Sequence, residues 1–151
     1  MQRSSWTPAE FGQMGLRHAV DVFVYRFGPG GPEYLLLISE PRREQAWRPV
    51  TGAVGWDEDL RRAALRRVRA EVGLDYAHDL VLPAAGLLEE IGDLRLVHWP
   101  FGFQLAAPAC EPRPRDRVAG WQWTPFAGAL DALANSTHRR NLVALHLHLA
   151  A

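Results

Sequence analysis

Two glutamates and two arginines are spaced along residues 52–74 in a pattern that could bind a phosphate or a metal ion. Glu58 precedes Arg66, and Arg67 lies four residues before Glu71. Residues four apart in a helix share one face, so Arg67 and Glu71 can meet a common ligand or pair with each other. Carboxylate oxygens are ligands that Mg²⁺ prefers, and guanidinium groups bind phosphate oxygens two at a time. The segment therefore offers groups that could contact a metal ion or a phosphate, and it leaves open whether Glu71 binds metal or pairs with Arg67.

A helix between strands is expected to position these side chains. Asp57 can cap its start, and Gly73 can end it in the left-handed conformation. Alternating β-branched residues predict a strand over 17–26, and a continuous apolar run predicts one over 34–39 that is covered on both faces. Further strands are expected over 47–54, 79–91, 94–107 and 118–123, with a hairpin turn at 91–93. A short helix is expected from 124–125, and a last helix capped by Asn135 or Ser136. This order predicts an α/β domain.

Composition limits the classes of function. A chain of 151 residues with zero net charge fits one domain and gives no global field to attract nucleic acid or an anionic membrane. The basic stripe over 61–69 is interpreted as a solvated helix face, which argues against a nucleic-acid partner. Cys110 is the single cysteine, which excludes an intramolecular disulfide and favours a cytoplasmic location. No apolar run approaches the ~18 residues that span a bilayer. The sequence leaves monomer and homodimer open.

The segment resembles the Nudix box, G-x5-E-x7-R-E-U-x-E-E-x-G-U, where U is a bulky aliphatic residue. Seven residues fall in register: Gly52, Glu58, Arg66, Val68, Glu71, Gly73 and Leu74. The approach Trp47-Arg48-Pro49-Val50-Thr51-Gly52 and the C-terminal part resemble the branch that includes dihydroneopterin triphosphate pyrophosphohydrolase. The resemblance covers roughly 17–150 and implies a Nudix-type α/β/α sandwich with a mixed sheet. The whole chain, 1–151, is then one Nudix-like domain with an N-terminal extension over 1–16.

Two box positions depart from the pattern. Arg67 and Ala70 stand where the family has glutamates that hold divalent metal. The resemblance implies an Mg²⁺ or Mn²⁺ cofactor with Glu71 as the remaining metal ligand, and catalytic roles for Glu58, Arg66 and Glu71. A positive charge at 67 would repel a cation by roughly 4 kcal/mol at ~4 Å near a surface. Metal binding is therefore expected to be weak, and Glu71→Gln is expected to affect stability less than changes at Gly52 or Gly73.

Other residues could serve a phosphorylated substrate. The expected substrate-binding residues are Arg42, Arg43, Arg48, Gly52 and Arg67. Rescue of the metal site by an acid outside the box is considered for Glu40, Asp57, Asp59, Glu89, Glu90 and Asp116, and stacking of a ring for Trp47, Trp99, Trp121 and Trp123. For each of these acids and tryptophans the alternative is a solvated surface group or core packing.

Two hypotheses of different class follow. The first is a Nudix-type pyrophosphohydrolase of a nucleoside-diphosphate-linked or related metabolite, weak or altered in activity because two box glutamates are replaced. The second is a non-catalytic Nudix-fold domain that binds a phosphorylated ligand or a protein. Under both hypotheses the box contacts a small phosphorylated metabolite or a protein partner, and no membrane partner is expected.

Overall fold

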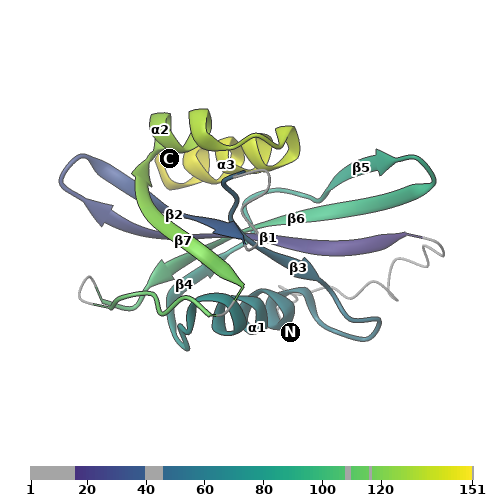
Figure 1. Cartoon of the computed structure of the whole chain (residues 1–151), viewed down its shortest axis with the longest axis horizontal. Coiled ribbons are helices and arrows are strands. Elements are labelled where there is room, and N and C mark those ends of the chain that lie inside the picture. Colours follow the sequence, from purple (N-terminus) through teal and green to yellow (C-terminus); the bar gives the residue numbers. More distant parts are fainter. Residues whose placement is uncertain (1–15, 40–45, 108–109, 116, 151) are drawn as a thin grey trace.

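A mixed sheet of seven strands lies between one helix on one face and two helices on the other (Figure 1). The chain is described by a computed structural model over residues 16–39, 46–107, 110–115 and 117–150. The strands are β1 Arg17–Gly28, β2 Gly31–Ser39, β3 Val50–Ala53, β4 Ala77–Val81, β5 Leu87–Ile91, β6 Leu94–Leu105 and β7 Val118–Pro125. The helices are α1 Leu60–Val72, α2 Phe126–Ala132 and α3 Ser136–Ala150. The expected α/β/α sandwich is confirmed.

The long central strands β1 and β6 run parallel, and the other pairings are antiparallel. The order is β4-β6-β1-β2-β7, with β3 paired to β1 and β5 paired to β6. Side chains alternate between the faces of a strand. Val20 and Val22 of β1 accordingly pack with the α1 side of the core, whereas Phe23 and Tyr25 pack with α2 and α3. Asp21 lies on the same face of β1 as Phe23, within this apolar surrounding.

Helix α1 begins later than expected. Asp59, rather than Asp57, is the N-cap, and its carboxylate accepts from the N–H of Arg61. The Glu58 N–H donates to the Gly55 carbonyl at 3.1 Å, which turns the chain before the helix. Gly73 ends the helix with φ of 69°, as expected.

Three further boundaries differ from the sequence-based expectations. The strand expected over 79–91 is two strands, because Pro83 has no N–H for a ladder. The strand expected over 47–54 narrows to β3, since Pro49 interrupts it and residues 47 and 48 form only isolated bridges. Pro125 caps α2 instead of occupying its first turn. The last helix does begin as predicted, because the Asn135 side chain accepts from the His138 N–H at 3.0 Å.

Substitution of Gly73 by valine is expected to destabilise the domain. A β-branched residue at positive φ is strained by roughly 1–3 kcal/mol, and a Cβ there would also meet the Arg113 Cβ and carbonyl oxygen at 3.2 Å. Urea unfolding should show the loss. Gly30→Val is the control, because a Cβ on Gly30 meets nothing within 4 Å. Equal losses of stability in Gly73→Val and Gly30→Val would contradict the view that the backbone conformation and close contacts at position 73 require glycine.

Candidate functional site

The loop before α1 is tied to the helix by the glutamate and arginine at positions 58 and 66. Arg66 Nε and Nη2 donate to the two Glu58 oxygens at 2.7 and 2.8 Å, and Nη2 also donates to the Ala53 carbonyl. Glu58 accepts from the Gly55 N–H at 2.9 Å. The hydrogen bond from Arg66 lowers the pKa of Glu58, against a smaller opposing effect of burial. These bonds hold the loop 53–58 in a fixed shape over the start of the helix.

Glu71 is a buried partner of an arginine from outside the box. Arg48 Nη1 and Nη2 donate to the two Glu71 oxygens at 3.0 Å each, a bidentate pair. The Thr51 N–H adds a longer contact of 3.3 Å to the same carboxylate. Glu71 is 9% exposed. This revises the expectation that Glu71→Gln barely changes stability, because the carboxylate neutralises a guanidinium inside the fold.

Arg67 reaches the same carboxylate from the helix. Its Nη2 lies 3.5 Å from Glu71 Oε2, so the i, i+4 contact considered from the sequence is present. Its Nε donates to the Thr51 carbonyl at 3.3 Å. The side chain lies against Gly52, where a Cβ would fall on Arg67 Nε. Gly52 therefore permits close approach of Arg67, while Ala70 faces solvent on the same helix.

Two guanidinium groups thus surround one carboxylate at the box. Both Glu71 oxygens are already bonded, and the two arginines leave this cluster with net positive charge. The described box residues do not offer Mg²⁺ the several free carboxylates that it prefers. The geometry suits contact with an anion better than contact with a dication.

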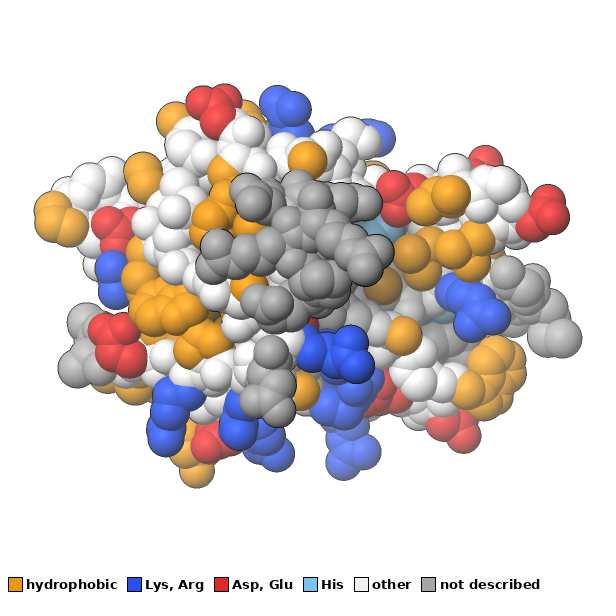
Figure 2. Space-filling view, in the orientation of Figure 1, with side chains coloured by type: hydrophobic (Ala, Val, Ile, Leu, Met, Phe, Trp, Pro, Cys, Tyr) orange, Lys and Arg blue, Asp and Glu red, His pale blue; other side chains and the backbone are white. Residues whose placement is uncertain are grey.

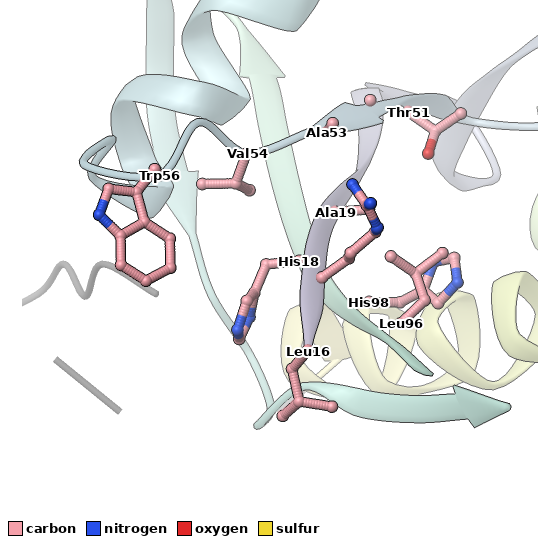
Figure 3. A pocket seen from close by; sticks show the side chains of 11 residues that line it. Leu16, His18, Ala19, Thr51, Ala53, Val54, Trp56, Leu96 and His98 are labelled. Carbon is pink, nitrogen blue, oxygen red and sulfur yellow. The ribbon is translucent and has the colours of Figure 1, made fainter. Parts of the chain in front are cut away.

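An apolar cavity of about 400 Å³ opens beside the box loop. The residues that line it come from the start of β1, from β3 and the loop after it, and from β6 (Figure 3). Figure 3 shows Trp56 and His18 toward one end of the cavity and Thr51 and His98 toward the other. The Trp56 side chain is 64% exposed, so an aromatic ring is available to a ligand. Size and lining are typical of a small-molecule site.

Arginines also gather on the surface over α1. Figure 2 shows basic side chains along the lower part of the molecule, where Figure 1 places this helix. A shallow hollow there is lined by Glu58, Arg62, Leu65, Arg66 and Arg69. Arg69 pairs with Asp75 at 2.9 Å and Arg66 with Glu58, so part of this charge is neutralised locally.

A buried polar cluster lies on the opposite face of the sheet from α1. Asp21 is fully buried and accepts from Thr51 Oγ1 and Asn141 Nδ2 at 3.1 Å each. His98 Nδ1 lies 3.1 Å from both Asp21 oxygens, and its Nε2 lies 2.8 Å from Glu89 Oε1. His138 Nε2 is 3.6 Å from Asp21 Oδ1. Strand β1, strand β6 and helix α3 thus bring together three groups that could each ligate a metal.

Burial and charge act differently on the two histidines. Burial lowers the pKa of His98, but hydrogen bonds and charges from Asp21 and Glu89 outweigh it, so the net direction is upward. Burial dominates at His138 and lowers its pKa. The cluster therefore holds one histidine that favours positive charge and one that favours the neutral form.

Comparison with known proteins identifies the family. The family model described as NUDIX domain matches residues 15–145, most of the chain. The chain belongs to the Nudix family. A search of curated protein sequences finds no match.

Solved Nudix structures share the fold at low sequence identity. A putative NUDIX hydrolase from Listeria monocytogenes aligns with TM-score 0.76 and 15% identity, covering 88% of this chain and 94% of its own. Dihydroneopterin triphosphate pyrophosphohydrolase of E. coli aligns with a TM-score of 0.74 and 19% identity, and the alignment covers 87% of this chain and 95% of that chain. The NUDIX domain of Shewanella oneidensis NrtR, complexed with ADP ribose, aligns with a TM-score of 0.71 and 16% identity. The alignment covers 95% of this chain and 99% of that chain. At these identities the likeness establishes the fold alone.

Nudix enzymes generally use divalent metals. The catalytic, metal-binding and substrate-binding roles expected from the sequence for individual residues of this domain stay predictions. Glu58 and Arg66 are joined as the box pattern implies. Glu71, the predicted metal ligand, forms an ion pair with Arg48, which was predicted to bind substrate. Arg42 and Arg43 lie outside the described residues, as do Glu40 and Asp116. None of the described helices has the length and apolar character needed to cross a membrane.

The remaining candidates from the sequence have other surroundings. Glu89 bonds with His98, whereas Glu90 faces solvent beside Arg95. Trp99 is buried in the core and Trp123 stacks under Arg26, whose guanidinium carbon lies 4.2 Å from the ring centre. The sequence reasoning missed Trp56 and the Asp21 cluster. An acid between Val20 and Val22, in the apolar middle of β1, is the signal that could have revealed the cluster.

Proposed function

We propose that this Nudix domain binds a phosphorylated small molecule that carries a ring, of the nucleoside-diphosphate class, and hydrolyses it slowly or not at all with Mg²⁺. The observation that carries this proposal is the bidentate bond between Arg48 and Glu71. It occupies the one box carboxylate left on this face of α1. Without free carboxylates for a metal among the described box residues, the charge of a leaving phosphate is not neutralised there in the way that metal-dependent hydrolysis needs.

The cavity supports the ligand class. Trp56 offers an exposed ring for stacking, and Arg17 and the Gly52–Val54 backbone line the same cavity. Arg67 lies against Gly52, a lining residue of the cavity, and its guanidinium can meet phosphate oxygens next to the cavity. Binding of ADP ribose by the NrtR Nudix domain is consistent with a ligand of this class.

A second candidate is the hydrolase activity of the family. It is favoured by the intact Glu58–Arg66 network, which keeps the box loop in place through Gly55 and Ala53. Hydrolysis by this chain would then need acids from outside the box. Turnover of a nucleotide panel with Mg²⁺, followed by phosphate release, separates the two candidates.

The ligand proposal predicts that Trp56→Ala weakens binding of ADP ribose in the presence of chelator by roughly tenfold. Stacking on an aromatic side chain contributes about 1–3 kcal/mol, and 1.4 kcal/mol is tenfold in affinity. Titration calorimetry measures the change. Trp121→Ala is the matched control, because Trp121 is also exposed but does not line the cavity. Equal loss in both variants, or the absence of binding by the unaltered chain to any nucleoside diphosphate, would contradict the proposal.

A further inference from the structure

We infer that Asp21, His98 and His138 form a binding site for a divalent transition-metal ion, separate from the Nudix box. The site lies on the α3 side of the sheet. It requires neither hydrolysis nor nucleotide binding and therefore stands independently of the function proposed above.

The three donor atoms are already close enough to share one ion. They are Asp21 Oδ1, His98 Nδ1 and His138 Nε2, and one ligand atom from each residue lies within 4.8 Å of the other two. Two of the separations are 3.1 Å, from His98 to Asp21, and 3.6 Å, from His138 to Asp21. Ligands at ~2.0–2.1 Å from a tetrahedral metal lie roughly 3.3–3.4 Å apart. Small side-chain shifts therefore suffice to form a site.

The surroundings of His98 match those of a histidine that binds metal. Metal-bound histidines usually donate their other ring N–H to a carboxylate, and His98 Nε2 lies 2.8 Å from Glu89 Oε1. Without a metal ion, a proton on Nδ1 bridges His98 and Asp21. A metal ion would take the place of that proton between Nδ1 and Asp21, while the N–H toward Glu89 keeps the ring in its orientation.

His138 supplies the second, independent observation. The residue is 8% exposed, and its Nε2 turns toward Asp21 but stops at 3.6 Å, beyond a good hydrogen bond. Its Nδ1 is buried and has no hydrogen-bond partner among the described residues. With the proton of the neutral ring on Nδ1, the lone pair of Nε2 faces the Asp21 carboxylate, where a metal ion could bind it.

Charge and access agree with this assignment. Asp21 and Glu89 bring two carboxylates to the cluster, and Thr51 and Asn141 orient Asp21 by hydrogen bonds. The guanidinium of Arg48 acts electrostatically on His138, but Glu71 neutralises it. The cavity is lined by His98 and Thr51, which gives an ion a path to the cluster.

The donor set selects the class of ion. Two imidazoles with one carboxylate suit Zn²⁺, Co²⁺, Fe²⁺ or Mn²⁺, whereas Mg²⁺ and Ca²⁺ prefer oxygen ligands alone. Thr51 lies between this site and the box, because its N–H contacts Glu71 while its hydroxyl donates to Asp21. The donor residues of the site are not box residues, so single variants can test each centre.

The test is titration of the full-length, chelator-stripped protein with Zn²⁺ and Co²⁺. We expect one equivalent to bind, with a cobalt absorption spectrum typical of a site with nitrogen and oxygen ligands. His98→Ala and His138→Gln should each weaken binding at least tenfold. His148→Ala, which changes an exposed histidine on the same helix, should leave it unchanged. Circular dichroism tests whether each variant folds. If one of the two histidine variants does not fold, Asp21→Asn is titrated in its place.

Three results would overturn the inference. They are no stoichiometric binding of either ion, binding that survives both His98→Ala and His138→Gln, and an equal loss in His148→Ala, which would indicate surface histidines. Binding of ADP ribose in chelator is measured in parallel. Loss of metal binding with nucleotide binding retained would refute this site alone, and the reverse result would refute the proposed ligand alone.

Discussion

Replacing Arg48 by alanine is expected to lower the free energy of unfolding by about 3 kcal/mol, because the buried Glu71 carboxylate loses its bidentate partner and keeps only the longer contacts with Arg67 at 3.5 Å and the Thr51 N–H at 3.3 Å. The side chains of Arg48 and Glu71 are only 16% and 10% exposed, and they are joined by two bonds of 3.0 Å. Chemical denaturation followed by fluorescence measures the loss.

Two controls define the cause. Arg69→Ala breaks an exposed pair with Asp75, whose side chains are 66% and 58% exposed, and should cost under about 1 kcal/mol. Arg48→Met combined with Glu71→Leu removes both charges together and should recover most of the stability. Similar losses for Arg48→Ala and Arg69→Ala would contradict a buried pair.

Restoring acids at the two altered box positions should raise Mg²⁺ affinity at least tenfold. Arg67→Glu with Ala70→Glu places acids at 67, 70 and 71 on one helical face and removes a positive charge that lies 3.5 Å from Glu71. Arg48 still neutralises Glu71 in this variant, so adding Arg48→Gln should increase affinity further. Calorimetry measures the affinity, and phosphate release from a nucleotide panel measures any gain of hydrolysis.

The matched control is Arg67→Gln with Ala70→Gln, which changes shape similarly without adding carboxylates. It should leave Mg²⁺ affinity low. Robust turnover by the unaltered chain that the glutamate variant abolishes would contradict the account, because Arg67 would then be a working part of catalysis.

Local spacing explains what the sequence could predict. Glu58 and Arg66 lie eight residues apart on a loop and the helix that follows, so the pattern itself indicated their contact. The strands on both sides of α1 were visible as apolar and β-branched runs. The N-cap was misplaced because a hydrogen bond from Glu58 to Gly55, not the run of acids, decides where the helix begins.

Long-range contacts explain what the sequence could not predict. Arg48 and Glu71 are 23 residues apart, and the chain must form β3 and α1 before they meet. Asp21 and Asn141 are 120 residues apart and meet only when α3 packs on the sheet. The sequence spacing of the histidines in α3 gave no indication that His138 would face a carboxylate of β1.

The availability of Glu71 to a metal ion is most directly measured by titration of the unaltered protein with Mg²⁺, beside Glu71→Gln and His138→Gln. The account predicts no site tighter than millimolar in the unaltered protein and no change on replacing Glu71, because Arg48 already holds both oxygens of this carboxylate. A micromolar Mg²⁺ site that disappears in Glu71→Gln and persists in His138→Gln would contradict it.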